Sequence, residues 1–171
     1  MTEKLVNWIV GLLGISGGAV LGKYIVVFII SLLPILELRG GLIAASLLKL
    51  DPLPSYIISI VGNLLPIPFI LWLISWFLDK LKTTKTFSGI ATKLENKALS
   101  KKDKIEKYGF WGLVLFVGIP LPGTGAWTGS LIASLLEMDR KKAFLAIVIG
   151  VVMASVIMML LSFGVLRNII G

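Results

Sequence analysis

The sequence contains no cysteine and no histidine, and only 15% of its 171 residues are charged. The absence of cysteine excludes disulfide bonds and thiol catalysis. The absence of both residues excludes the usual zinc sites and an imidazole general base. No larger cluster of carboxylates takes their place as a catalytic group. We therefore expect neither enzyme activity nor a bound cofactor.

The sequence is rich in apolar residues. They make up 57% of the chain, and the mean hydropathy is +0.97. Soluble domains are about 45–50% apolar and about 25% charged. A helical crossing of a bilayer needs about 20 residues, so the length allows roughly four to six membrane segments. We predict an all-α integral membrane protein that forms a single membrane domain over residues 1–171.

The net charge of +8 is distributed unevenly. Nine of the seventeen basic residues lie between Lys80 and Lys107, which is typical of a cytoplasmic loop beside a membrane rather than of a nucleic-acid-binding protein. We expect residues 79–107 to be a cytoplasmic linker of a multi-pass protein in the cell inner (plasma) membrane. From Ser88 onward the linker fits either an amphipathic helix on the inner leaflet or a solvated helix. The apolar run from Leu5 to Leu21 fits either a membrane anchor or a signal peptide.

A long segment of the sequence occurs twice. PILELRGGLIAASLLKLD at 34–51 returns, altered, as PGTGAWTGSLIASLLEMD at 122–139, 88 positions later. We predict an internal duplication, with a first copy at about 24–78 and a second at about 109–166. The alignment without gaps pairs Phe28 with Phe116, Pro34 with Pro122, Gly41 with Gly129, Asp51 with Asp139, and Gly62 with Gly150.

Each copy begins with an apolar stretch that is interrupted in its middle. The stretch 24–50 is too long for one crossing and is broken at Pro34 and by the glycines of ELRGG. It predicts a re-entrant hairpin that enters along 24–33, has a broken tip at 34–41 and leaves along 42–50. The alternative is one proline-kinked crossing helix. The stretch 109–136 predicts a second hairpin, broken at 120–125.

Full crossings are predicted after each hairpin, at 56–78 and 143–166. Asn63, Pro66 and Pro68 lie within the first crossing and should distort its middle. A hairpin returns to the face that it enters, so the basic residues 140–142 should be cytoplasmic. Residues 49–55 should then lie outside. This makes the two copies an inverted repeat with opposed hairpins, an arrangement that places binding sites at the membrane midplane.

Glu37 and Arg39 are the ionisable residues of the first tip. Each would cost roughly 2.5–3.5 kcal/mol at a helix centre, so such residues are functional candidates. Arg39 suits an anionic head group, especially phosphate, and Glu37 can bind and release protons. The alternative is a structural ion pair that closes the tip.

The second tip carries no charge. Its glycines and Thr124 allow a close approach of the backbone, and helix N–H groups there could face an anion; turn chemistry alone explains them equally well. Trp127 fits either a lid or packing. The predicted substrate or ion site comprises Glu37, Arg39, Gly40, Gly41 and Asn63 from the first copy, and Pro122, Gly123, Thr124, Gly125 and Trp127 from the second.

The two tips carry a resemblance to a known family. ELRGG at 37–41 together with PLPGTGAWTGSLIASLL at 120–136 resembles the small multidrug export family, over nearly the whole chain. That family is similar to the DedA (VTT-domain) superfamily, which implies two opposed re-entrant hairpins and the movement of lipids, including polyprenyl-phosphate carriers. Many DedA proteins carry arginine in the second tip, where this chain has Thr124, Gly125 and Ala126.

Three functional hypotheses are consistent with these residues. The leading hypothesis is an ion-coupled transporter of an anionic lipid or lipid-phosphate carrier, in which Arg39 holds the head group and Glu37 couples to protons. The second is a proton-driven exporter of cationic amphiphiles with Glu37 as counter-charge. The third is a membrane scaffold that docks partners through its lysine loop. Expected partners are membrane lipids, the substrate, a coupling proton or other cation, and, as one possible assembly, a second copy in a homodimer.

Overall fold

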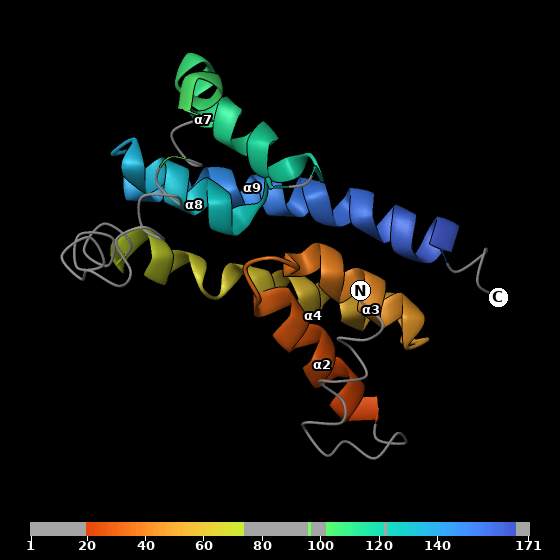
Figure 1. The fold of residues 1–171 in the computed structure, drawn as a ribbon. Coiled ribbons are helices and arrows are strands. Elements are labelled where there is room, and N and C mark those ends of the chain that lie inside the picture. The colour runs from red at the N-terminus through yellow and green to blue at the C-terminus, as the bar shows by residue number, and fades with distance from the viewer. Residues whose placement is uncertain (1–19, 74–95, 97–101, 122, 167–171) are drawn as a thin grey trace. The chain divides into compact units, whose positions relative to one another are not determined.

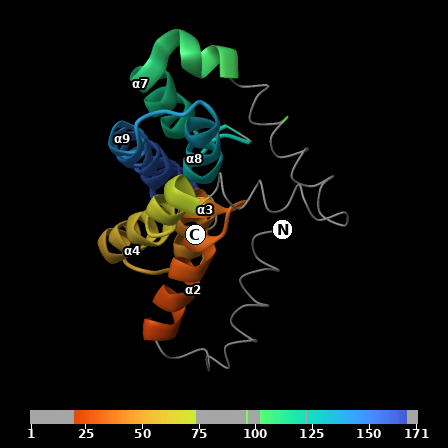
Figure 2. The same ribbon diagram turned by 90° about the vertical axis from the view of Figure 1, so that its left-hand side faces the viewer.

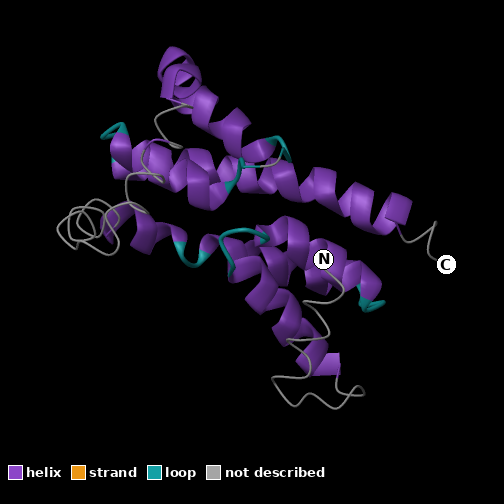
Figure 3. Cartoon of the chain, in the orientation of Figure 1, coloured by secondary structure: helices purple, strands orange, loops and turns teal. Residues whose placement is uncertain are grey.

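The computed structural model describes residues 20–73, 96, 102–121 and 123–166 (Figure 1). Every regular element within these ranges is a helix (Figure 3), so the all-α prediction is confirmed there. Most of the segment 5–21 and of the linker 79–107 lies outside the described residues.

The first hairpin consists of α2 (Val20–Leu32) and α3 (Glu37–Leu47), which pack against each other. Val26 and Ile30 of α2 form a core cluster with Ala44 of α3. Ile30 also lies next to Gly40. Residues later in α2 therefore contact residues earlier in α3. The two helices are therefore antiparallel, and the chain turns back between them.

The predicted boundaries of this tip were wrong. The break spans residues 33–36, and ELRGG at 37–41 forms the first turns of α3 instead of an irregular tip. Pro34 lacks a backbone N–H and disfavours a helical residue before it, which explains the end of α2. The glycines do not loosen the helix, because α2 packs directly against them. The re-entrant placement of this hairpin in a bilayer stays a prediction.

In the part of the chain that the structure describes, two helices are long and apolar enough to cross a membrane, Pro52–Leu73 and Arg140–Gly164. The first starts one turn earlier than predicted, because Pro52 occupies the first helical position, where its missing N–H is not needed. It contains α4 (Pro52–Leu64) and the predicted distortion, a turn at 65–66, after which the helix resumes. The second contains α9 (Arg140–Met159) and continues as the π-helical η1 (Leu160–Leu166).

The second hairpin consists of α7 (Lys102–Gly118) and α8 (Ala126–Leu135). Within α7 the backbone bends at Gly109, whose φ of 52° is not helical (Figure 2). The break at 119–125 contains the predicted tip 120–125.

Both hairpins end in the same capping motif, 88 residues apart. The N–H of Leu50 donates to the carbonyl of Ala45 at 3.0 Å, and that of Met138 donates to Ala133 at 3.0 Å. Each bond spans five residues, and the residue just before the donor, Lys49 or Glu137, is left-handed; together these features define a Schellman motif. The left-handed residues are Lys49 (φ 55°) and Glu137 (φ 52°), and both motifs lead directly into a long helix. The shared geometry supports the predicted duplication.

The left-handed conformation at Glu137 gives a prediction about stability. A left-handed residue with a side chain costs roughly 1–2 kcal/mol, whereas glycine adopts this conformation freely. Glu137 is exposed, so few contacts are lost with its side chain. We expect Glu137→Gly to raise the melting temperature in detergent by about 2–4 °C. A lower melting temperature would show that the carboxylate has a stabilising contact.

Matched glycines show how the two copies align in space. A Cβ at Gly62 would lie 2.8 Å from the Phe28 carbonyl oxygen, and one at Gly150 would lie 2.8 Å from that of Val114. Phe28 therefore corresponds to Val114, not to Phe116 as the alignment without gaps predicted. The second break, at 119–125, is longer than the first, at 33–36, which accounts for the shift.

The chain forms two compact units, Met1–Leu65 with Val152–Gly171, and Pro66–Val151. Each contains one hairpin, the first half of the long helix that follows it, and the second half of the other long helix. Residues 66–73 of the second unit correspond to 154–161 of the first at the offset of 88. The two units thus consist of equivalent segments, as a duplication requires. The inversion of one copy relative to the other stays a prediction.

Candidate functional site

Glu37 begins α3 and is 4% exposed, the only buried charged side chain among the described residues. Its φ is 52°, a conformation that costs a residue with a side chain about 1–3 kcal/mol and that clusters at functional sites. Its repeat counterpart is Gly125, with φ 137°. Both positions have a positive φ, and the first predicted copy carries a buried carboxylate there.

Arg39 lies two residues further along α3 and is half-buried. The Glu37 carboxylate is enclosed by protein, whereas the guanidinium is partly reached by solvent or lipid. The two charges interact electrostatically.

The helix α4 presents a polar face to the first hairpin. Ser55, Ser59 and Asn63 recur every four residues and are all fully buried. The Ser55 hydroxyl donates to the carbonyl of Asp51 at 2.7 Å. The Ser59 hydroxyl and both polar atoms of the Asn63 amide have no hydrogen-bond partner among the described residues. Buried polar groups of this kind are costly unless something binds them.

Asn63 lies at the level of Glu37, and Ser59 lies one helical turn away, at the level of Gly41. A Cβ at Gly41 would lie 3.0 Å from the Ser59 Oγ, which fixes the register of α3 against α4. The short connection at 48–51 makes the two helices antiparallel. One turn back along α3 is Glu37, and one turn further along α4 is Asn63, so both occupy the same layer. We call Glu37, Ser59 and Asn63 the polar layer.

The second copy has no equivalent of this layer. Ser59 corresponds to Ile147 and Asn63 to Val151, both fully buried, and Glu37 corresponds to Gly125. The same packing therefore forms with apolar side chains. The sequence prediction included Glu37 and Asn63 but missed Ser59, although the spacing of 55, 59 and 63 was a visible signal.

Gly40 and Gly41 have a structural explanation. A Cβ at Gly40 would lie 2.7 Å from the Leu36 Cβ. One at Gly41 would overlap the Ser31 Oγ. Gly40 thus makes room for Leu36 of the break and for Ile30 of α2, 3.2 Å from the same position, and Gly41 allows the close approach of α2 at Ser31.

The second tip is held by its own hydrogen bonds. The Thr124 hydroxyl lies 2.9 Å from the Ile119 carbonyl oxygen and 2.8 Å from that of Leu121. Gly123 has a φ of 79°, and Trp127 is half-buried on α8. Pro122 lies outside the described residues. Thr124 thus fixes the turn, which favours turn chemistry over ligand binding for its hydroxyl.

Comparisons with known proteins give one match. A family model described as "Putative small multi-drug export protein" matches residues 37–157, a range that starts at Glu37 and includes the second tip. The relation to the DedA superfamily lies outside this match and stays a prediction. No curated protein and no solved structure matches the chain. Among the described residues no group of acidic side chains could hold a metal ion.

Proposed function

Because the match covers residues 37–157 of 171, the chain belongs to the small multidrug export family, and we propose that it exports small amphiphilic cations in exchange for protons. The observation that carries this proposal is the polar layer, a buried carboxylate with an amide and a hydroxyl that the second copy replaces by apolar residues. The second copy forms without these groups, and the buried Ser59 hydroxyl and Asn63 amide have no hydrogen-bond partner among the described residues, which supports a ligand site here.

The chemistry of exchange follows from a single carboxylate. In its charged form Glu37 offers a counter-charge to an organic cation, and in its protonated form it does not. Intramembrane carboxylates commonly serve in this way as proton relays. The Asn63 amide and the Ser59 hydroxyl can accept or donate hydrogen bonds to the polar part of the substrate. Arg39 interacts electrostatically with Glu37, so a bound cation would compete with the guanidinium for the carboxylate.

A second candidate function depends on Arg39. Its half-buried guanidinium could hold the head group of an anionic lipid, since its planar fork matches phosphate. Glu37 would then couple lipid movement to protons, as the resemblance to DedA proteins implies. The family description favours the export of small molecules.

Substitutions at Arg39 distinguish the two candidates in reconstituted liposomes. Under cation export, Arg39→Lys and Arg39→Ala should both keep gradient-driven efflux of a cationic dye, and the alanine variant should match or exceed the wild type. Under lipid transport, Arg39→Lys should lose most translocation of a fluorescent anionic lipid, because a point charge does not replace the fork. Protein-free liposomes and Glu137→Gly serve as controls. Translocation of lipid without dye efflux by the wild type would overturn the export proposal.

A further inference from the structure

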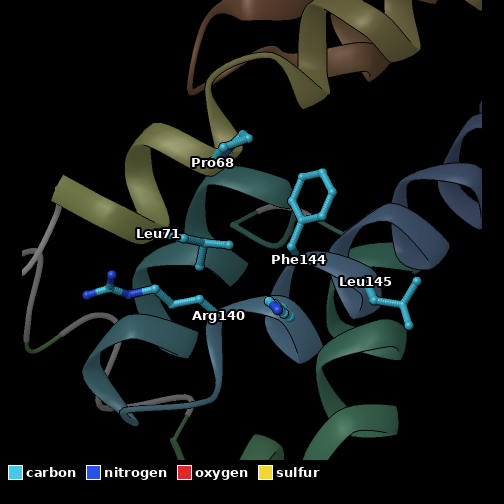
Figure 4. Close-up of a pocket in the computed structure, with 6 residues that line it drawn as sticks. Pro68, Leu71, Arg140, Phe144 and Leu145 are labelled. Atoms are coloured by element: carbon cyan, nitrogen blue, oxygen red, sulfur yellow. The ribbon is translucent and has the colours of Figure 1, made fainter.

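An apolar groove with a cationic rim lies at the start of α9, in the second unit. Its volume is about 480 Å³, and it is lined by Pro68, Leu71, Phe144 and Leu145 together with Arg140 and Lys141 (Figure 4). Pro68 and Leu71 come from the helix that ends at Leu73, and the other four residues come from α9. Among the described residues, no acidic side chain lines the groove. This volume is within the range of small-molecule sites.

The fold does not require the cations at this helix start. In the first copy the positions of Arg140, Lys141 and Lys142 are held by the uncharged sequence PLP at 52–54, and α4 still forms. Cations are moreover disfavoured at a helix N-terminus, where the macrodipole is positive. The Asp139 carboxylate accepts the Lys142 N–H at 2.9 Å and so caps the helix already. The cations at 140 and 141 therefore serve something other than the helix.

Residues beside the groove are typical of a membrane interface. Trp72, next to the lining residue Leu71, is 66% exposed, and exposed tryptophan is typical of the head-group region. The basic residues 140–142 predict the cytoplasmic side, where the leaflet is rich in anionic lipids.

We propose that this groove binds an anionic phospholipid, with the head group held by Arg140 and Lys141 and an acyl chain lying against Leu71, Phe144 and Leu145. The charge of the rim selects the anionic head group, and the apolar walls select the chain. The site is separate from the polar layer and does not depend on the proposed export of cations.

Lipid titration of the full-length protein in a non-ionic detergent, followed by native mass spectrometry, tests this site. The probes are dioleoyl phosphatidylglycerol, dioleoyl phosphatidylcholine and glycerol phosphate. Each basic residue near a lipid surface strengthens binding by about fivefold, so the double variant Arg140→Gln/Lys141→Gln should bind phosphatidylglycerol roughly thirtyfold more weakly. Lys142→Gln removes the same charge one residue outside the lining set and should weaken binding clearly less than Lys141→Gln.

Three results would overturn the proposal. Equal affinity for the two phospholipids would exclude selection of the anionic head group. An equal loss in Lys142→Gln and Lys141→Gln would indicate bulk attraction without a defined site. Displacement of phosphatidylglycerol by glycerol phosphate, with no effect of Phe144→Ala, would indicate a site for free anions. We expect Phe144→Ala to weaken phosphatidylglycerol binding and glycerol phosphate not to compete.

Discussion

Replacing Glu37 with glycine is expected to abolish substrate transport while the protein remains folded. Glycine adopts the positive φ of this position freely, as Gly125 does at the equivalent place in the second copy. The relief of strain, about 1–3 kcal/mol, should offset the loss of the side-chain contacts of Glu37. Transport should fall to background, because no other described charged side chain is buried. Thermal unfolding in detergent and efflux from liposomes measure the two effects.

Glu137→Gly is the matched control for this variant. Both glutamates have a φ of 52°, but Glu137 is exposed and ends α8, while Glu37 is buried. Both substitutions relieve the same backbone conformation, so only the loss of transport should separate them. Glu37→Gln adds the complementary test, since glutamine has the shape of the protonated carboxyl. We expect it to fold, to bind substrate more weakly and to lose its dependence on a pH gradient.

Two outcomes would contradict the exchange mechanism. If Glu37→Gly and Glu37→Gln both failed to fold, the carboxylate would be half of a structural ion pair, whose disruption typically costs about 3–5 kcal/mol. If both variants folded and retained gradient-driven efflux, Glu37 would have no part in coupling.

The sequence predicted the helices and their pairing into two helical hairpins because these depend on apolar runs and on the prolines that interrupt them. The duplication stays a prediction, which the equivalent segments of the two units support. Pro34 and Pro120 lie in the two breaks. The sequence repeat at an offset of 88 is matched in the structure by two Schellman motifs 88 residues apart. The register of the first helix in each copy was not predictable in this way. This register depends on which residue of the first helix contacts Gly62 or Gly150. Phe28 contacts Gly62, whereas Val114 contacts Gly150, two positions before Phe116, which the alignment pairs with Phe28. The identical residues of the two copies do not reveal this shift, which the longer second break accounts for.

The candidate site was predicted only in part. Glu37 and Asn63 were predicted because ionisable and amide groups are costly in a membrane. Their common level depends on the contact between Gly41 and Ser59, which no sequence pattern gives. Ser59 shares a four-residue spacing with Ser55 and Asn63 in the sequence, but serine is common in apolar helices, and only the structure shows that its hydroxyl is buried without a partner among the described residues.

The largest loss of stability is expected from alanine at the two matched glycines of the long helices. In Gly62→Ala the new Cβ would lie 2.8 Å from the Phe28 carbonyl oxygen, and in Gly150→Ala 2.8 Å from that of Val114. A backbone carbonyl inside a packed helix cannot rotate away as a side chain can. The long helix and the helix that carries the carbonyl must therefore move apart. Overpacking typically costs 1–3 kcal/mol, and we expect about 3 kcal/mol for each variant. Gly164→Ala, where a Cβ meets nothing within 4 Å, should leave the melting temperature unchanged or raise it.

The nature of the obstructing atom separates these glycines from Gly41. In Gly41→Ala the obstruction is the Ser31 hydroxyl, a side-chain group that can rotate or be removed. We therefore expect a smaller loss, and the double variant Gly41→Ala/Ser31→Ala should recover much of it in thermal unfolding. No side-chain deletion should rescue Gly62→Ala, because its obstruction is a carbonyl oxygen. Rescue of Gly62→Ala by Ser31→Ala would show that the Ser31 Cβ, 3.0 Å from the same position, is the true constraint and that α2 can move relative to α4.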